Sequence, residues 1–305
     1  MAFPCTWLSL VRWREWLLAL GFRRRGLRQR ILQADPQTTV ACWCMPPDLE
    51  DPRKPALLLI HGFGGSSTLQ WAKQIRPLQK QFRLFLPDLV FFGKSFTVSQ
   101  HRSEIFQAEM IASAMEFMGV KSYSVLGISY GGFVAFQLAH IFQERVEKVI
   151  IVSSGICMSP RDVEELLARG NVQKVPDLFV PETRAALKNL IKMSFLKPPP
   201  LLFSFILDDV IQNMCGTCRK ELTELLDALQ KRQGEGALPT LPQKVLIIWG
   251  DQDGIFPLHL AHQLKRHLGE NASLAVIKNA SHAVQLEKPV EFTKIVLKFL
   301  LHGSV

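Results

Sequence analysis

Short apolar runs alternate with helix-like segments along most of this chain, and this alternation constrains the fold more than any other feature. The run at residues 56–60 is continuously apolar, as expected of a strand buried on both faces of a sheet. The alternation predicts an α/β fold, with a mostly parallel sheet flanked by helices. The expected strands are residues 30–34, 39–43, 56–60, 82–86, 123–126, 146–152, 245–249 and 274–277, and the expected helices between or after them are residues 105–117, 132–142, 258–268 and 290–301.

The alternation breaks between residues 155 and 242, where helical patterns follow one another without a strand pattern. We interpret this block as a helical cap that is inserted after the sixth strand and lies over the site. The α/β core is then formed by residues 28–154 and 243–305, and residues 1–27 form a separate N-terminal helix. The expected cap helices are residues 161–168, 184–193, 201–214 and 219–231, separated by prolines and glycines such as Pro176 and Gly234.

The most informative local motif is Gly127-Ile128-Ser129-Tyr130-Gly131, which joins the expected strand 123–126 to the following helix. A serine between glycines at a sharp strand-to-helix turn is how a nucleophile is held with its hydroxyl exposed above a sheet. Side chains at the glycine positions would crowd such a turn. Ser129 is therefore a candidate nucleophile.

A serine hydroxyl needs a base to take its proton and a third group to orient that base. His282 lies in the loop that follows the last expected strand, and open α/β sheets carry their reactive groups in loops at the carboxyl ends of strands. His282 is thus the candidate base. The loop after strand 245–249 contains Asp251 and Asp253, and either carboxylate could orient the histidine.

Such a serine also needs backbone N–H donors for the oxyanion that forms when it attacks. One donor is expected to be the N–H of Tyr130, directly after the serine, and the other should come from the loop that follows strand 56–60. That loop reads His61-Gly62-Phe63-Gly64-Gly65, and we assign the second donor to the N–H of Phe63. The loop lacks the Lys-Ser/Thr ending of a phosphate-binding loop and the spacing of a dinucleotide motif.

Composition and charge argue against a nucleic-acid-binding protein and against a disulfide-rich one. The chain has 305 residues, of which 48% are apolar and 21% charged, as in ordinary globular enzymes. Its net charge of +9 is concentrated near the start, and without a basic-aromatic array elsewhere we expect no nucleic-acid partner. Six cysteines in a chain of this length are expected to be reduced thiols of a cytoplasmic protein. Cys215 and Cys218 lack the preceding strand of a redox motif, so we expect neither metal nor cofactor.

The combined pattern resembles the α/β-hydrolase superfamily, in particular its capped Ser-His-Asp hydrolases, over residues 28–301. The order of nucleophile, acid and histidine in that family matches Ser129, Asp253 and His282. In the family's acid motif the second acidic position belongs to the triad, so the resemblance implies Asp253 rather than Asp251. The matching segments are His61-Gly62-Phe63-Gly64, Pro87-Asp88-Leu89, Trp249-Gly250-Asp251-Gln252-Asp253 and Leu286-Glu287-Lys288-Pro289.

Within the superfamily, the chain is similar to plant members, to monoacylglycerol-lipase-like esterases and to bacterial hydrolases that cleave carbon–carbon bonds. The resemblance implies a serine hydrolase that cleaves a carboxylic or lipid-like ester through an acyl-enzyme, as a monomer or homodimer. Phe63 and Tyr130, with Phe203 and Ile206 of the cap, are expected to bind the substrate. The alternatives are carbon–carbon bond cleavage of the meta-cleavage type and a small-ligand receptor on the same fold.

The first 22 residues combine tryptophans and leucines with arginines, and Arg23-Arg24-Arg25 follows them. The apolar run is interrupted by charges and is too short to span a bilayer. The segment fits either a helix packed on the enzyme's own body or an amphipathic helix at a membrane surface. Because the expected sheet begins later, deletion of residues 1–22 is expected to leave the site intact.

Overall fold

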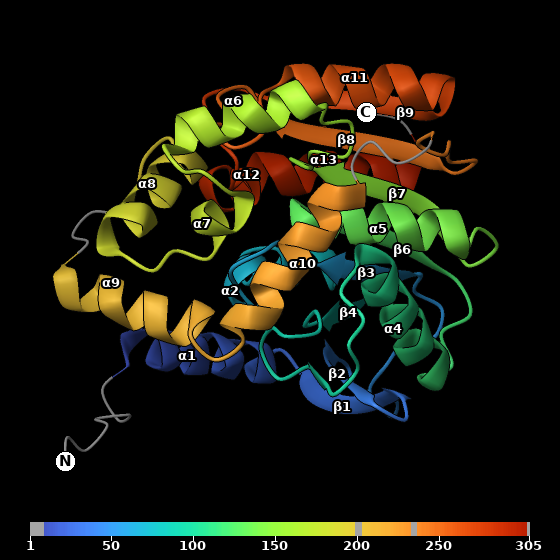
Figure 1. Cartoon of the computed structure of the whole chain (residues 1–305). Coiled ribbons are helices and arrows are strands. Elements are labelled where there is room, and N and C mark those ends of the chain that lie inside the picture. Colours follow the sequence, from blue (N-terminus) through green and yellow to red (C-terminus); the bar gives the residue numbers. More distant parts are fainter. Residues whose placement is uncertain (1–8, 199–202, 233–236, 304–305) are drawn as a thin grey trace, which may run out of the picture.

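The computed structural model describes residues 9–198, 203–232 and 237–303, which form a sheet of nine strands between two layers of helices (Figure 1). The strand order is β1-β2-β4-β3-β6-β7-β8-β9, and the two-residue strand β5 pairs with β2. The pairs β4-β3, β3-β6, β6-β7, β7-β8 and β8-β9 are parallel. Strand β2 pairs antiparallel with β1, β4 and β5. The strands are β1 (Arg28–Asp35), β2 (Thr38–Cys44), β3 (Ala56–Ile60), β4 (Arg83–Pro87), β5 (Phe96–Thr97), β6 (Tyr123–Ile128), β7 (Val146–Val152), β8 (Lys244–Gly250) and β9 (Ala272–Ile277). The predicted fold class is confirmed.

Helices cover both faces of the sheet, and each face has its own apolar cluster. One cluster contains α4 (Glu104–Phe117), α5 (Tyr130–Ile141) and α11 (His259–Leu268). The other contains α2 (Ser67–Trp71), α3 (Ile75–Leu78), α12 (Val284–Glu287) and α13 (Pro289–His302). Strands β3, β6, β7 and β8 are mostly buried, which explains why their sequences are mostly apolar.

Five α-helices and a π-helix lie between β7 and β8 in the described residues, and no strand is found there. They are α6 (Pro160–Gly170), α7 (Val175–Phe179), α8 (Arg184–Ser194), α9 (Ser204–Val210), the π-helix η1 (Ile211–Cys215) and α10 (Arg219–Arg232). We call this segment the helical insertion. It follows the seventh strand rather than the sixth because the short β5 gave no sequence signal. Leu201, Leu202 and Gly234 lie outside the described residues.

Pro176 does not separate helices as expected. It stands in the first turn of α7, where the missing N–H of proline costs no helical hydrogen bond. Helix α6 begins at Pro160 for the same reason, and Ser159 and Asp162 close its start with a capping box. The sequence pattern therefore missed α7 because its first turn contains a residue that usually ends a helix.

Helix α1 (Leu10–Arg24) packs against α2 and α9, and its residue Phe22 is buried in the core. The ring of Phe22 meets that of Trp43 on β2 edge to face, with ring centroids 5.4 Å apart. Deletion of residues 1–22 would remove this buried ring, so we expect it to lower the stability of the core. That the deletion leaves the site intact stays a prediction. No helix among the described residues is long and apolar enough to cross a membrane. Trp7 lies outside those residues.

Candidate active site

Ser129 stands at the turn between β6 and α5, with backbone angles of φ 54° and ψ −120°. A non-glycine residue with positive φ is strained, and such strain is found mostly at functional sites. The surrounding structure holds the turn in place: the N–H of Ser129 donates to the carbonyl of Val152 at 2.8 Å, and its own carbonyl accepts from Gly132 at 2.9 Å. The serine is buried to all but 8% of its surface.

The glycines around Ser129 are required by close approach rather than by their own backbone angles. A Cβ atom on Gly127 would lie 2.0 Å from the carbonyl oxygen of Gly131, and one on Gly131 would lie 2.4 Å from that of His61. Both distances are far shorter than any real contact. The sequence interpretation, that side chains here would crowd the turn, agrees with this geometry.

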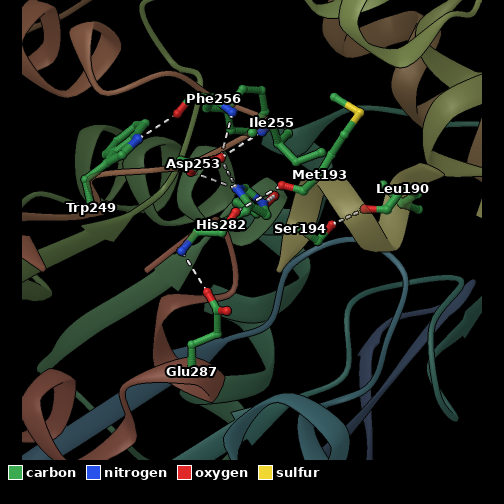
Figure 2. A network of polar contacts seen from close by, with 12 residues as sticks. Leu190, Met193, Ser194, Trp249, Asp253, Ile255, Phe256, His282 and Glu287 are labelled. Carbon is green, nitrogen blue, oxygen red and sulfur yellow. Dashed lines mark hydrogen bonds and ion pairs between the residues drawn. The ribbon is translucent and has the colours of Figure 1, made fainter. Parts of the chain in front are cut away.

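His282 lies between Ser129 and Asp253 and contacts both side chains. Figure 2 shows His282 beside Asp253. Its Nε2 is 3.0 Å from the Ser129 Oγ, and its Nδ1 is 3.0 Å from the Asp253 Oδ2. The side chain of Asp253 is fully buried. Its Oδ1 also accepts from the N–H groups of Ile255 and Phe256, both at 2.9 Å. These bonds fix the carboxylate so that it can orient the imidazole ring.

Asp251, the other candidate acid, points elsewhere. Its Oδ1 accepts from the N–H of Ala280 at 3.4 Å, and its Oδ2 lies 3.7 Å from the Lys278 Nζ. It therefore supports the turn beside the histidine loop. The structure thus brings Asp253, and not Asp251, to His282.

His61 fixes the loop that follows β3. Its Nε2 accepts from the N–H of Leu89 at 2.9 Å, so its Nδ1 carries the proton and donates to the carbonyl of Gly62 at 2.8 Å. Burial lowers the pKa of His61 below its ordinary 6.5, which keeps the ring neutral and this proton arrangement stable. The N–H of Gly62 donates to the Gln70 side chain at 2.8 Å. The loop is therefore held from two sides.

The two amides assigned to an oxyanion lie beside the serine. A Cβ atom on Gly62, directly before Phe63, would be 3.0 Å from the Ser129 Cβ. Tyr130 is the first residue of α5, and an N–H at this position has no acceptor within its helix. The rings of Phe63 and Tyr130 meet edge to face at 5.8 Å. The residues that carry both amides thus lie near Ser129, and their role as donors to an oxyanion stays a prediction.

An apolar cavity of about 40 Å³ opens at Ser129. A water molecule needs roughly 10–15 Å³ measured in this way, so the cavity has room for a short chemical group. No arginine or lysine lines it among the described residues. The lining comes from the core (Phe63, Ser129, Tyr130, Phe133, Phe256) and from the segment after β7 (Met158, Val163, Leu166, Val175, Phe179, Leu226, Leu229, Gln230).

A second cavity, of about 900 Å³, lies within the helical insertion. Gln230 borders both cavities. The second cavity is lined by charges of both signs, such as Lys174, Asp177 and Arg219. Apolar side chains such as Val172 and Val180 complete its lining, which is therefore mixed.

Phe63 and Tyr130 line the cavity at Ser129 as expected of substrate-binding residues, but Phe203 and Ile206 do not. Helix α9, which carries Ile206, packs against α1 instead, and Phe203 directly before it is 51% exposed. The expectation for these two residues is therefore corrected. The apolar residues that cover the cavity come from α6, α7 and α10, where the sequence pattern gave no reason to choose them.

Sequence reasoning also missed how the insertion is attached to the histidine loop. The Glu287 Oε2 accepts from the N–H of Ser281 at 2.7 Å, while its Oε1 accepts from Leu196 and Lys197. Figure 2 shows Glu287 and the carbonyl of Met193 on either side of this loop. The sequence indicates Glu287 only as part of the segment Leu286-Glu287-Lys288-Pro289, which matches the family.

Comparisons with known proteins agree with this architecture. The family model described as the alpha/beta hydrolase fold matches residues 55–195. A pimeloyl-[acyl-carrier protein] methyl ester esterase of Pectobacterium carotovorum subsp. carotovorum (strain PC1) is 29% identical, over 80% of this chain and 93% of its own. A 2-hydroxy-6-oxononadienedioate/2-hydroxy-6-oxononatrienedioate hydrolase of Pseudomonas sp is 26% identical, over 72% of this chain and 77% of its own.

Among solved structures, a membrane phospholipase A described as a bacterial virulence factor superposes with a TM-score of 0.77. It is 26% identical, and the match covers 97% of this chain and 91% of that one. With the sheet order and the strained serine turn, these matches show that the chain has the α/β-hydrolase fold, and the two curated relatives named above are hydrolases.

Proposed function

We propose that this protein is a serine hydrolase that cleaves an uncharged carboxylic ester with a short acyl group. The observation that carries the proposal is the chain of contacts from Asp253 through His282 to the strained Ser129. A serine activated in this way can attack an acyl carbon.

The proposed reaction has two steps. In the first, the Ser129 Oγ bonds to the acyl carbon while the His282 Nε2 takes its proton. The carbon–oxygen bond of the ester then breaks, and the alcohol leaves with that proton. In the second, water attacks the acyl-enzyme, His282 takes a proton from the water and returns it to Ser129, and the acid leaves. Asp253 holds the imidazole and balances its positive charge. The N–H groups of Phe63 and Tyr130 bind the oxyanion.

The cavity supports the choice of substrate class. Its small volume and apolar lining fit a short acyl group, whereas the larger cavity beyond Gln230 also contains charged side chains of both signs. In this proposal the helical insertion acts as a cap, and substrates with longer chains require it to move. No metal or cofactor takes part in these steps.

Carbon–carbon bond cleavage is the second candidate, because a dienedioate hydrolase is among the relatives. A dienedioate carries carboxylates, and buried carboxylates need a cationic or hydrogen-bonding partner. The described lining of the cavity offers no arginine or lysine. This difference favours the neutral ester.

Turnover of p-nitrophenyl esters of graded acyl length tests the proposal, with Ser129→Ala as the matched control. We expect hydrolysis that is fastest for acetate and butyrate and falls for longer chains, and a loss of about 10⁴-fold or more in the variant. A ring-fission dienoate, followed by its absorbance, is assayed in parallel. Faster cleavage of the dienoate would favour the second candidate. Binding of a small ester without turnover would favour a receptor.

A further inference from the structure

Helix α1 turns an apolar strip away from the protein. Trp13 is 59% exposed and Trp16 is 53% exposed, and Leu10 and Leu17 are exposed beside them. At 3.6 residues per turn these four side chains lie within an arc of roughly 120°. Phe22, on the opposite side, is buried. The strip is therefore not used for packing in the described part of the chain.

The neighbouring helix adds further exposed rings. The N–H of Val11 on α1 donates to the Asp209 Oδ2 on α9 at 2.8 Å, and Figure 1 shows the two helices side by side. Phe203 and Phe205 are both exposed, and their rings stack with centroids 5.8 Å apart. Exposed clusters of large apolar side chains on soluble folds mark sites of interaction with a partner or a membrane.

The exposed charges of α1 are all positive. Arg12, Arg14, Arg23 and Arg24 are exposed. By the helical period the first three lie on the flanks of the apolar strip, and Arg24 lies at its C-terminal end. Glu15, the acidic residue of this helix, points inward and accepts a hydrogen bond from the Ser66 hydroxyl at 2.7 Å. An apolar strip with basic flanks is the pattern of a helix that lies in the surface of an anionic bilayer.

We propose that α1 docks on a membrane surface that contains anionic lipid, with Trp13, Trp16 and Leu17 in the headgroup region. The flanking arginines would then contact lipid phosphates, while their carbon stems lie along the apolar layer. Charge argues against a second copy of this chain as the occupant, since two such helices would bring their arginines together. This proposal does not depend on the proposed hydrolase activity.

Co-sedimentation of the full-length protein tests the docking proposal, with vesicles of phosphatidylcholine alone and with added phosphatidylserine. One variant, Trp13→Gln/Trp16→Gln, removes the apolar contact, and another, Arg12→Gln/Arg14→Gln, removes the charge. The controls change exposed residues on other helices, as in Phe117→Gln/Val290→Gln for the apolar pair and Lys265→Gln/Arg266→Gln for the basic pair.

Wild type should bind the anionic vesicles more tightly than the neutral ones. The tryptophan variant should bind at least about tenfold more weakly to both, because binding scales with buried apolar area. Each arginine near an anionic surface contributes about 1 kcal/mol, or about fivefold, so the arginine variant should lose about 30-fold on anionic vesicles alone. Both control variants should bind as wild type does.

Equal binding by wild type and the tryptophan variant would overturn the proposal. So would concentration-dependent self-association of wild type that the tryptophan variant abolishes while vesicle binding is unchanged. Quenching of wild-type tryptophan fluorescence by brominated lipid gives a test that needs no variant. The core residues Trp43, Trp71 and Trp249 are buried and out of reach of the lipid, so absence of quenching would also overturn the proposal.

Discussion

Replacing Glu287 should loosen the loop that carries His282. One oxygen of its carboxylate accepts from the N–H of Ser281, next to the histidine, at 2.7 Å. The other accepts from the N–H groups of Leu196 and Lys197 in the helical insertion, at 2.9 and 3.2 Å. A single side chain thus ties the histidine loop to the segment that covers the cavity.

The size of the effect follows from these three bonds. A hydrogen bond to a charged group contributes about 1.5–3 kcal/mol. Glu287 is only half-buried, so water replaces part of each bond when the side chain is removed. We therefore expect Glu287→Ala to lower the free energy of unfolding by about 2–4 kcal/mol, and Glu287→Gln by less, since its amide oxygen still accepts one set of bonds. A displaced His282 should lower kcat by roughly tenfold or more, with KM changed little.

Urea denaturation and steady-state hydrolysis of a short ester measure the two effects. Glu291→Gln, an exposed glutamate near the start of α13, is the matched control and should behave as wild type. Glu287→Gln should have a higher kcat than Glu287→Ala, but a lower one than wild type. If Glu287→Ala stays within about 0.5 kcal/mol of wild type, the change expected of a neutral surface substitution, and keeps its kcat, the proposed attachment is refuted.

Three further changes should each give a distinct result. Asp253→Asn should lower kcat by up to ~10⁴-fold while Asp251→Asn changes it by only a few-fold; steady-state kinetics showing the reverse order would mean that the acid is misassigned. Gly131→Ala places a Cβ 2.4 Å from the carbonyl oxygen of His61, so both the melting temperature and ester turnover should fall, and wild-type values of both would contradict the crowding argument. Burial raises the pKa of Glu104 above its ordinary 4.5, so its contribution to stability is complete below pH 4.5 and is lost as pH rises through the raised value. The free energy of unfolding of wild type relative to Glu104→Gln, from urea denaturation, should therefore fall from pH 4.5 to 7, and a constant difference would contradict this.

The sequence was sufficient for the parts of the site that depend on local pattern. The glycines beside Ser129 and the position of His282 after the last strand each follow from the chemistry of a short segment. The geometry of the acid also agrees with the choice of Asp253, although that choice depended on a family resemblance rather than on residue chemistry. Spacing alone did not distinguish it from Asp251, because both lie in the same loop.

Contacts between distant segments could not be predicted in this way. The packing of Phe22 on Trp43 is not predicted, because nothing in the segment that contains Phe22 indicates it. Phe203 looked like a pocket residue because it stands in an apolar run, yet it is exposed. Pro176 looked like a helix breaker, but it occupies the position in a first turn where proline is tolerated. Each error concerns a residue whose environment is set by another part of the chain.

The central claim, that Ser129 is an activated nucleophile, is tested most directly by covalent labelling. Wild type is treated with a fluorophosphonate, and the modified peptide is identified by mass spectrometry. We predict one adduct per chain on Ser129, no adduct in Ser129→Ala, and much slower labelling in His282→Gln, because the base that activates the serine is then absent. An unlabelled wild-type Ser129, or labelling of equal rate in His282→Gln, would contradict the account.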